Sequence, residues 1–196
     1  MSCEPKEPLP RTTFKEKGNT MRRLGIAILM VLGLSACTGK PALEDEKLSR
    51  AEFNLEEFFD GHVIAYGQFQ DVFGTVRRRF VVEIDGNWDG NTLVLDENFV
   101  YADGTTEQRV WTLRKTGAQT WAGTAPGVIG SATGEERGDT FNWTYQIDLP
   151  VPDGTLRVNF DDWMWQLSET RVLNKAYMKR FGVDIGEVTI TFEKQI

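Results

Sequence analysis

The segment Thr140–Leu149, TFNWTYQIDL, decides the fold class of this chain. Apolar and polar residues alternate along it without a break, which is the pattern of a half-buried strand. Neighbouring side chains of a β-strand point to opposite faces, so the whole apolar set shares one face, which must be buried. That set consists of Phe141, Trp143, Tyr145, Ile147 and Leu149.

The same alternation recurs along most of the chain. Val188, Ile190 and Phe192 alternate with charged and hydroxyl residues. Further runs with strand character span residues 62–70, 75–85, 92–101, 105–115, 120–125 and 155–167, and clusters of Gly, Asn and Asp separate several of them. We therefore predict an all-β chain of consecutive short strands.

Closure into an antiparallel up-and-down barrel is the predicted architecture, because closure removes exposed sheet edges and no long helical crossover interrupts the strands. A two-sheet β-sandwich is the alternative. One short C-terminal helix is predicted over Asn174–Phe181, ending at Gly182, since glycine accepts the left-handed conformation that follows a helix.

The register of one hairpin can be derived from the sequence. If Tyr101 and Thr105 close a three-residue loop, Gly104 takes the left-handed position of a bulge turn. Glu97 then lies opposite Arg109, on the same face as the apolar residues. The apolar pairs on that face are Leu95 with Trp111 and Leu93 with Leu113.

A second hairpin extends this inner face. If Asp85 and Thr92 close it, Phe80 lies opposite Glu97, Val82 lies opposite Leu95, and Arg78 is next along the inner face. Arg78, Glu97 and Arg109 then form an inward cluster. Charges on an inner face are costly unless they are paired or hydrated. The cluster is either a structural ion pair or an arginine site for the polar end of a ligand.

The stretch Asp161-Asp162-Trp163-Met164-Trp165 places two carboxylates beside bulky aromatic residues. Adjacent strand residues face opposite ways, which excludes an acid and base acting on one bond. One carboxylate is expected to face inward with a hydrogen-bond partner, and Asp162 is the binding-site candidate. The two tryptophans are expected to seal a barrel end or to lie near a membrane surface.

Glycines punctuate the segment from Trp121 to Thr133 and just beyond it. They are Gly123, Gly127, Gly130 and Gly134. Glycine within a strand marks a bend at a barrel corner or a place where another group approaches the backbone closely.

The N-terminal region has the features of a secretory signal. Arg22-Arg23 precede an apolar run of 11 residues, Leu24–Leu34, which is too short to span a bilayer. The following Leu34-Ser35-Ala36-Cys37 resembles the lipobox of bacterial lipoproteins, whose cysteine becomes the acylated first residue. By resemblance to the sorting rule of Gram-negative lipoproteins, Thr38 indicates the outer membrane. The membrane is then a partner through the lipid on Cys37.

These features divide the chain into four segments. Residues 1–20 are an upstream extension ahead of Met21, 21–36 the signal peptide, 37–52 the lipidated cysteine and tether, and 53–196 the barrel domain.

Composition excludes several classes of protein. With 196 residues, 40% hydrophobic, 26% charged and a net charge of -7, the chain is long and apolar enough to fold and too acidic for nucleic-acid binding. Its one histidine, His62, and two cysteines, Cys3 and Cys37, make a zinc site or a Ser-His-Asp triad poor hypotheses. No phosphate-binding glycine loop or dinucleotide motif is present. We predict no catalytic residues, no metal and no cofactor.

A succession of short motifs between about 54 and 194 resembles a family of uncharacterised Gram-negative lipoproteins classed as a domain of unknown function. The motifs are Phe59-Asp60-Gly61, Gly67-Gln68-Phe69-Gln70-Asp71, Arg78-Arg79-Phe80, Gly86-Asn87-Trp88, Glu97-Asn98-Phe99, Asp103-Gly104, Arg109-Val110-Trp111, Val128-Ile129-Gly130-Ser131-Ala132-Thr133-Gly134, Phe160-Asp161-Asp162-Trp163-Met164, Asn174-Lys175-Ala176 and Phe181-Gly182. The sequence departs from the pattern at Gly138-Asp139, where Gly-Asn is expected. The resemblance implies a lipid-anchored domain with a lipocalin-like barrel and no established activity.

Two functions remain open. In one, a monomeric barrel binds a hydrophobic or amphipathic, fatty-acyl or lipid-like molecule between aromatic walls and the inward charges. In the other, the lumen is packed and the lipoprotein acts structurally or through protein contacts. Catalysis by Glu97 or Asp162 on a bound lipid is a third, weaker hypothesis. The candidate ligand-binding residues are Arg78, Glu97, Arg109, Trp111, Trp143 and Asp162.

Overall fold

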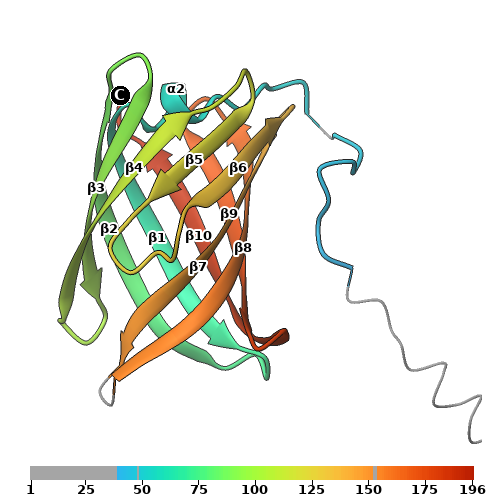
Figure 1. Cartoon of the computed structure of the whole chain (residues 1–196). Helices are drawn as coiled ribbons and strands as arrows, with labels where there is room; N and C mark the ends of the chain where they lie inside the picture. The colour runs from blue at the N-terminus through green and yellow to red at the C-terminus, as the bar shows by residue number, and fades with distance from the viewer. Residues whose placement is uncertain (1–38, 48, 152–153) are drawn as a thin grey trace, which may run out of the picture. The chain divides into compact units, whose positions relative to one another are not determined.

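The computed structural model describes residues 39–47, 49–151 and 154–196 (Figure 1). The chain divides into two units, Met1–Lys40 and Pro41–Ile196, and the second carries the fold. The expected upstream extension, signal peptide and Cys37 lie outside the described residues.

The described residues of the second unit form one short helix and ten strands. They are α2 (Leu55–Phe59), β1 (Gly61–Asp71), β2 (Val76–Trp88), β3 (Thr92–Tyr101), β4 (Thr106–Lys115), β5 (Thr120–Thr124), β6 (Ala132–Arg137), β7 (Thr140–Val151), β8 (Gly154–Ser168), β9 (Arg171–Arg180) and β10 (Val183–Lys194).

The strands form a closed antiparallel barrel. Each pairs with its neighbours in the sequence, and β1 pairs with β10, where Ala65 lies opposite Phe192. The predicted up-and-down barrel is therefore confirmed, and the two-sheet sandwich is excluded because the sheet has no free edge between β1 and β10. Among the described residues, no helix is both long and apolar enough to cross a membrane.

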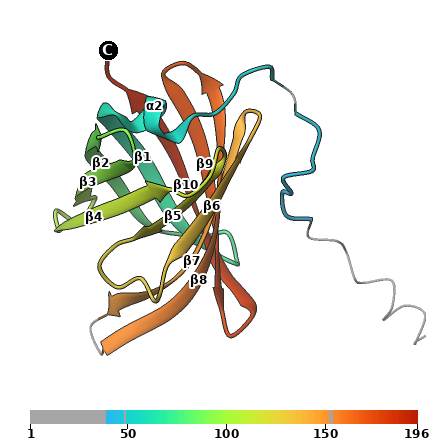
Figure 2. The same ribbon diagram turned by 45° about the horizontal axis from the view of Figure 1, so that its top comes forward.

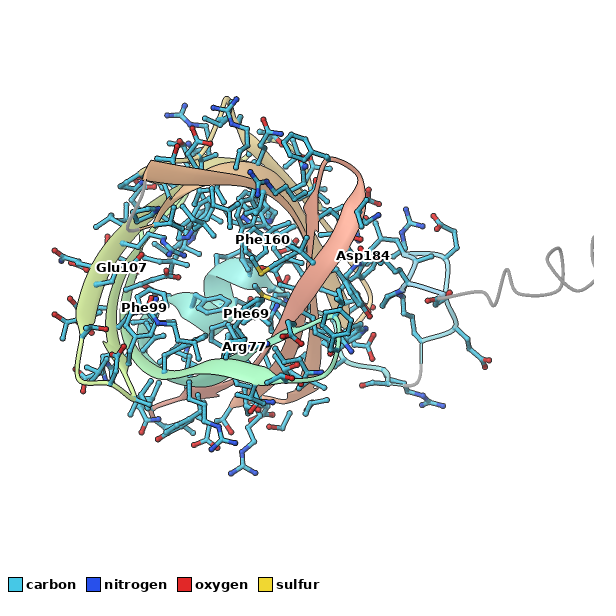
Figure 3. All side chains as sticks on the ribbon, turned by 90° about the horizontal axis from the view of Figure 1, so that it is seen from below. Phe69, Arg77, Phe99, Glu107, Phe160 and Asp184 are labelled. Carbon is cyan, nitrogen blue, oxygen red and sulfur yellow. The ribbon has the colours of Figure 1, made fainter. Side chains whose placement is uncertain are left out.

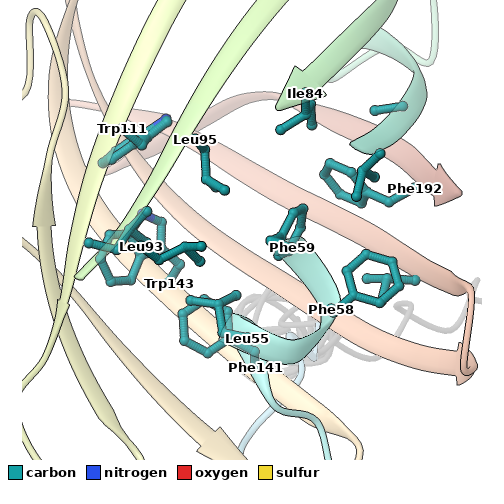
Figure 4. Close-up of a cluster of buried hydrophobic side chains, with 14 of the residues drawn as sticks. Leu55, Phe58, Phe59, Ile84, Leu93, Leu95, Trp111, Phe141, Trp143 and Phe192 are labelled. Carbon is teal, nitrogen blue, oxygen red and sulfur yellow. The ribbon is translucent and has the colours of Figure 1, made fainter. Parts of the chain in front are cut away.

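Helix α2 closes one end of the barrel (Figure 2). Its residues Leu55, Phe58 and Phe59 are buried among the inward side chains of the strands (Figure 4). The ring of Phe59 meets that of Phe192 edge to face, with centroids 5.3 Å apart. The N–H of Leu55 donates to the Glu136 carboxylate over 2.8 Å. Apolar packing and this hydrogen bond together hold α2 across the end.

The predicted C-terminal helix is wrong. Asn174–Phe181 belongs to β9 and the turn that follows it. Val172, Asn174, Ala176 and Met178 alternate with more exposed residues, which is the burial period of a strand. Gly182 does have a positive φ of 79°, but it lies in a β-hairpin turn and not at a helix end.

The register of the two predicted hairpins has different outcomes. Glu97 lies opposite Arg109 as derived, and Leu95 and Leu93 lie opposite Trp111 and Leu113. In the preceding hairpin Phe80 lies opposite Tyr101, and Ile84 opposite Glu97, so that prediction is wrong by four residues. The strand β2 continues to Trp88 because the turn is made later, around Gly90 at φ 96°. Because the pairing of β2 with β3 is shifted by an even number of residues, each side chain keeps its predicted face of the sheet, and Arg78 still points inward.

Two glycines of the punctuated segment are sites of close approach. A Cβ on Gly134 would overlap the rings of Phe141 and Trp143, and one on Gly123 would lie 3.0 Å from the Trp143 ring. Gly127 and Gly130 have positive φ values of 87° and 71° in the loop between β5 and β6. Both expected roles of these glycines therefore occur. Gly123 and Gly134 allow aromatic rings to approach the strands closely, and Gly127 and Gly130 let the loop bend.

Candidate functional site

The barrel encloses a cavity of about 420 Å³. Figure 3 looks into it from the end opposite α2, with Phe69, Phe99, Phe160 and Glu107 around the interior. Most of its wall is apolar. The lining residues are Ala65, Phe69, Arg78, Phe80, Val82, Ile84, Glu97, Phe99, Tyr101, Glu107, Arg109, Tyr145, Ile147, Leu149, Pro150, Val151, Leu156, Phe160, Asp162, Met164, Asn174, Ala176, Met178, Ile185, Val188, Ile190 and Phe192.

Polar side chains in this wall begin near the turn between β3 and β4. The guanidinium of Arg78 lies over the Tyr101 ring, 3.4 Å from its centroid, and donates to the Thr105 hydroxyl over 3.2 Å. Tyr101 donates its hydroxyl to Glu107 over 2.7 Å. Burial raises the pKa of Tyr101 to about 12, and the Glu107 carboxylate adds to that effect. This group presents both a cation and a hydrogen-bonded carboxylate to the lumen.

Arg109 and Glu97 lie further in. Arg109 forms an ion pair with Glu107, with Nη2 2.7 Å from Oε1, and its guanidinium lies 5.1 Å from the centroid of the Phe99 ring. Burial opposes ionisation of Glu107, but the hydrogen bonds from Tyr101 and Arg109 outweigh it and lower the pKa of this carboxyl. Burial raises the pKa of Glu97 to about 7, although Arg109 lowers it in part.

The inward cluster predicted from the sequence is thus present with a different pairing. Arg78, Glu97 and Arg109 all line the cavity. The ion pair that Arg109 makes is with Glu107, one step along its own face of β4, although Glu97 lies opposite Arg109 in the ladder. Glu97 makes no ion pair within the described cluster, and its burial in the cavity wall is the main cause of its raised pKa, which Arg109 lowers only in part.

Asp162 of β8 is a second inward carboxyl. It is 9% exposed and accepts a hydrogen bond from the amide of Asn174, whose Nδ2 also donates to the Trp163 carbonyl over 3.0 Å. Burial raises the pKa of Asp162 to about 7, while the Asn174 bond lowers it in part. The Oδ1 atom of Asn174 is buried without a hydrogen-bond partner. An unpartnered amide oxygen thus lies buried beside a carboxyl whose pKa is raised toward neutrality.

The phenol of Tyr145 lies on the same wall. Burial raises its pKa, and the charge of Asp162 adds to the shift. Its ring stacks on Phe160 with centroids 5.0 Å apart and meets Trp111 edge to face at 5.2 Å. Tyr145 thus joins the polar part of the cavity to the aromatic core.

Trp111 and Trp143 belong to that core and not to the cavity wall. Both are at most 6% exposed, and their rings meet edge to face with centroids 5.8 Å apart (Figure 4). Trp111 and Trp143, which were expected to bind a ligand, therefore pack beneath α2 and do not line the cavity. Trp163 and Trp165, expected to seal a barrel end or to lie near a membrane surface, stack on each other at 6.4 Å along the outward face of β8. The end is closed by α2 instead.

Sequence reasoning missed four polar residues of the cavity. Glu107 and Tyr101 share the inward parity of Arg109 and Glu97, so the derived register already contained them. Tyr145 belongs to the apolar set of the opening segment. Asn174 was hidden by the helix prediction, since a strand was needed to place it inward. Among the described residues no cluster of three or more His, Asp, Glu or Cys side chains has an arrangement that could hold a metal ion.

Fold and site together define a closed antiparallel barrel with an apolar cavity and buried, partly paired charges. Residues 31–194 match the family described as protein of unknown function (DUF3833), and the chain belongs to this family. No curated protein has a sequence that matches it.

Solved structures resemble the fold at low sequence identity. The S-type phycobiliprotein lyase CPES from Guillardia theta aligns with a TM-score of 0.54 and 10% identity, over 74% of this chain and 94% of that one. A redesigned β-barrel aligns with a TM-score of 0.41 and 11% identity, over 77% of this chain and all of that one (100%). The barrel EF1p2_mFAP2b bound to DFHBI aligns with a TM-score of 0.41 and 12% identity, over 76% and 100% of the two chains. At these identities the likeness shows the fold alone.

Proposed function

We propose that this protein is a lipoprotein, anchored in the outer membrane through Cys37 and facing the periplasm, whose barrel binds a hydrophobic or amphipathic small molecule of fatty-acyl or lipid-like character. The observation that carries the binding proposal is the cavity of about 420 Å³. Ligand sites typically occupy about 300–1,000 Å³, so an acyl chain or a small amphiphile is of suitable size.

The distribution of charge within the cavity supports an amphipathic ligand. Arg78, Tyr101, Glu107 and Arg109 line the cavity from β2, β3 and β4, toward the end opposite α2. Apolar side chains such as Phe69 of β1 and Phe160 of β8 line other sides of it. A polar headgroup would exchange hydrogen bonds with this cluster, while the apolar part would replace water along the aromatic wall. The alternative of a structural lipoprotein with a packed lumen requires a cavity no larger than a few waters.

The test is native mass spectrometry, with lipid extraction, of residues 41–196 exported to a bacterial periplasm. This segment contains α2 and all the described strands and forms a compact unit. We expect a co-purifying acyl species or uptake of added fatty acid. Ala176 lines the cavity and is 3% exposed, so Ala176→Phe should fill the lumen and abolish uptake.

The matched charge variants are Arg78→Ala, at the cavity, and Arg114→Ala, on the outward face of β4. Only the first should weaken uptake. An apo mass for the unmodified segment, with no uptake of added fatty acid, would overturn the binding proposal. The anchor is tested separately by fractionating cells that express the full chain. Wild type should sediment with membranes and Cys37→Ser should be found in the soluble periplasmic fraction.

A further inference from the structure

The barrel end opposite α2 carries protruding aromatic side chains. We call the segments 71–79, 102–105 and 179–184 of this end the mouth rim. They contain the turns between β1 and β2, β3 and β4, and β9 and β10, while the ends of β7 and β8 lie at the same end outside the mouth rim. Phe73 is 88% exposed and Phe181 89% exposed at the tips of two of these turns. The two turns lie side by side at the same end, since β1 pairs with both β2 and β10 (Figure 1).

The backbone of Phe181 is strained. Its φ is 50°, and the following Gly182 has a φ of 79°, so the turn holds two consecutive left-handed residues. Asn-Gly is the favoured pair for such a hairpin turn, and a bulky residue there is a genuine outlier. A large aromatic side chain that is both strained and solvated contributes nothing to the core. Its presence at this tip indicates a role outside the folded chain.

The charge of the mouth rim opposes that of the whole chain. Its segments contain Lys179, Arg180 and the run Arg77–Arg79, five basic residues, against the three acidic residues Asp71, Asp103 and Asp184. The chain as a whole has a net charge of -7. Arg77, Arg78 and Arg79 also line a surface hollow of about 380 Å³ beside Asp103, where Arg77 forms an ion pair with Asp71 over 2.7 Å and Arg78 donates to the Thr105 hydroxyl. Guanidinium groups around a hollow of this kind suit phosphate oxygens.

From these observations we infer that the mouth rim docks on the surface of an anionic phospholipid bilayer, with Phe73 and Phe181 inserted at the headgroup level and the basic side chains outside the cavity, Arg77, Arg79, Lys179 and Arg180, against lipid phosphates. Aromatic side chains favour the bilayer interface, and each nearby Lys or Arg is attracted to anionic lipid. The inference goes beyond the proposed ligand binding, because docking depends on the outer tips and not on the cavity. It would bring the open end of the barrel against the bilayer.

The test measures flotation of residues 41–196 with vesicles of phosphatidylethanolamine and phosphatidylglycerol. The segment omits Cys37, so a lipid anchor contributes nothing to binding. We expect binding that weakens in high salt and on pure phosphatidylcholine vesicles. The double variant Phe73→Ser with Phe181→Asn should reduce vesicle affinity about tenfold or more, since both inserting rings are lost. Phe181→Asn restores the favoured turn pair and Phe73 is 88% exposed, so the double variant is expected to fold, and an unchanged urea midpoint checks that reduced binding is not caused by unfolding.

Leu167→Ser is the matched control. Leu167 is 61% exposed at the other end of the barrel, near the turn between β8 and β9, and its loss should leave vesicle binding unchanged. Insertion is measured directly with an environment-sensitive fluorophore on Phe73→Cys, because residues 41–196 contain no other cysteine. Its emission should shift to the blue on vesicles, and that of labelled Leu167→Cys should not. Absence of vesicle binding, or equal loss in the Leu167 variant, would refute docking even if the cavity binds its ligand.

Discussion

Replacement of Asp162 by asparagine should make the barrel more stable at neutral and alkaline pH. Asp162 is buried, and its pKa rises from the usual 3.8 to about 7 in the folded chain. Between these values the folded state binds the proton and the unfolded state does not, so the contribution of Asp162 to stability is present below about pH 4 and is lost as pH rises to about 7. A difference of about 3 pKa units corresponds to about 4 kcal/mol, which is an upper bound.

Asparagine at position 162 cannot ionise, yet its Oδ1 can still accept the hydrogen bond from Asn174. The free energies of unfolding of wild type and Asp162→Asn, measured in urea, should therefore be similar at pH 4 and diverge by up to about 4 kcal/mol at pH 8 in favour of the variant. If the free energies of unfolding of wild type and Asp162→Asn differ by the same amount at pH 4 and pH 8, the argument from burial is refuted.

Three further predictions concern packing and the polar cluster. Gly134→Ala should lower the free energy of unfolding by about 1–3 kcal/mol, because a Cβ there overlaps the rings of Phe141 and Trp143; an unchanged urea midpoint would contradict the packing. Phe59→Ala should cost about 3–5 kcal/mol, since α2 loses a ring that is 2% exposed, and thermal unfolding would show a clearly lower Tm. Glu107→Gln should cost about 1 kcal/mol at pH 7 through weaker bonds to Tyr101 and Arg109. Because these bonds lower the pKa of Glu107, its contribution is present above about pH 4 and fades as pH falls, so the deficit of the variant should shrink in acid.

The alternating pattern predicted much of the fold because a strand displays its two faces at a period of two. The register of the hairpin between β3 and β4 followed from one short loop with Gly104 in the left-handed position, and the structure has the same pairing of Glu97 with Arg109. The neighbouring hairpin was placed four residues off, since its segment Gly86–Gly90 offers two glycines and only the second makes the turn. Local composition could not choose between them.

The position of the helix was the main failure in the fold. Asn174–Phe181 ends in Phe-Gly, and a positive φ at Gly182 is compatible with both a helix end and a hairpin turn. This segment forms a strand because its alternate residues, including Ala176 and Met178, become buried when the barrel closes. Leu55–Phe59 becomes helical because its three apolar residues have an open barrel end to cover, which only closure creates.

The sequence by itself determined which side chains of each strand face inward, since this depends only on parity along the chain. It therefore placed Arg78, Glu97 and Arg109 in the lumen. Only the tertiary structure decided how deep each inward side chain lies, which partner it contacts, and which part of the lumen stays unfilled. Glu107 pairs with Arg109, Trp111 and Trp143 pack beneath α2, and a cavity of about 420 Å³ with a mostly apolar wall remains toward the other end. These outcomes depend on distances across the barrel between residues far apart in the chain, and those distances arise only when β1 meets β10.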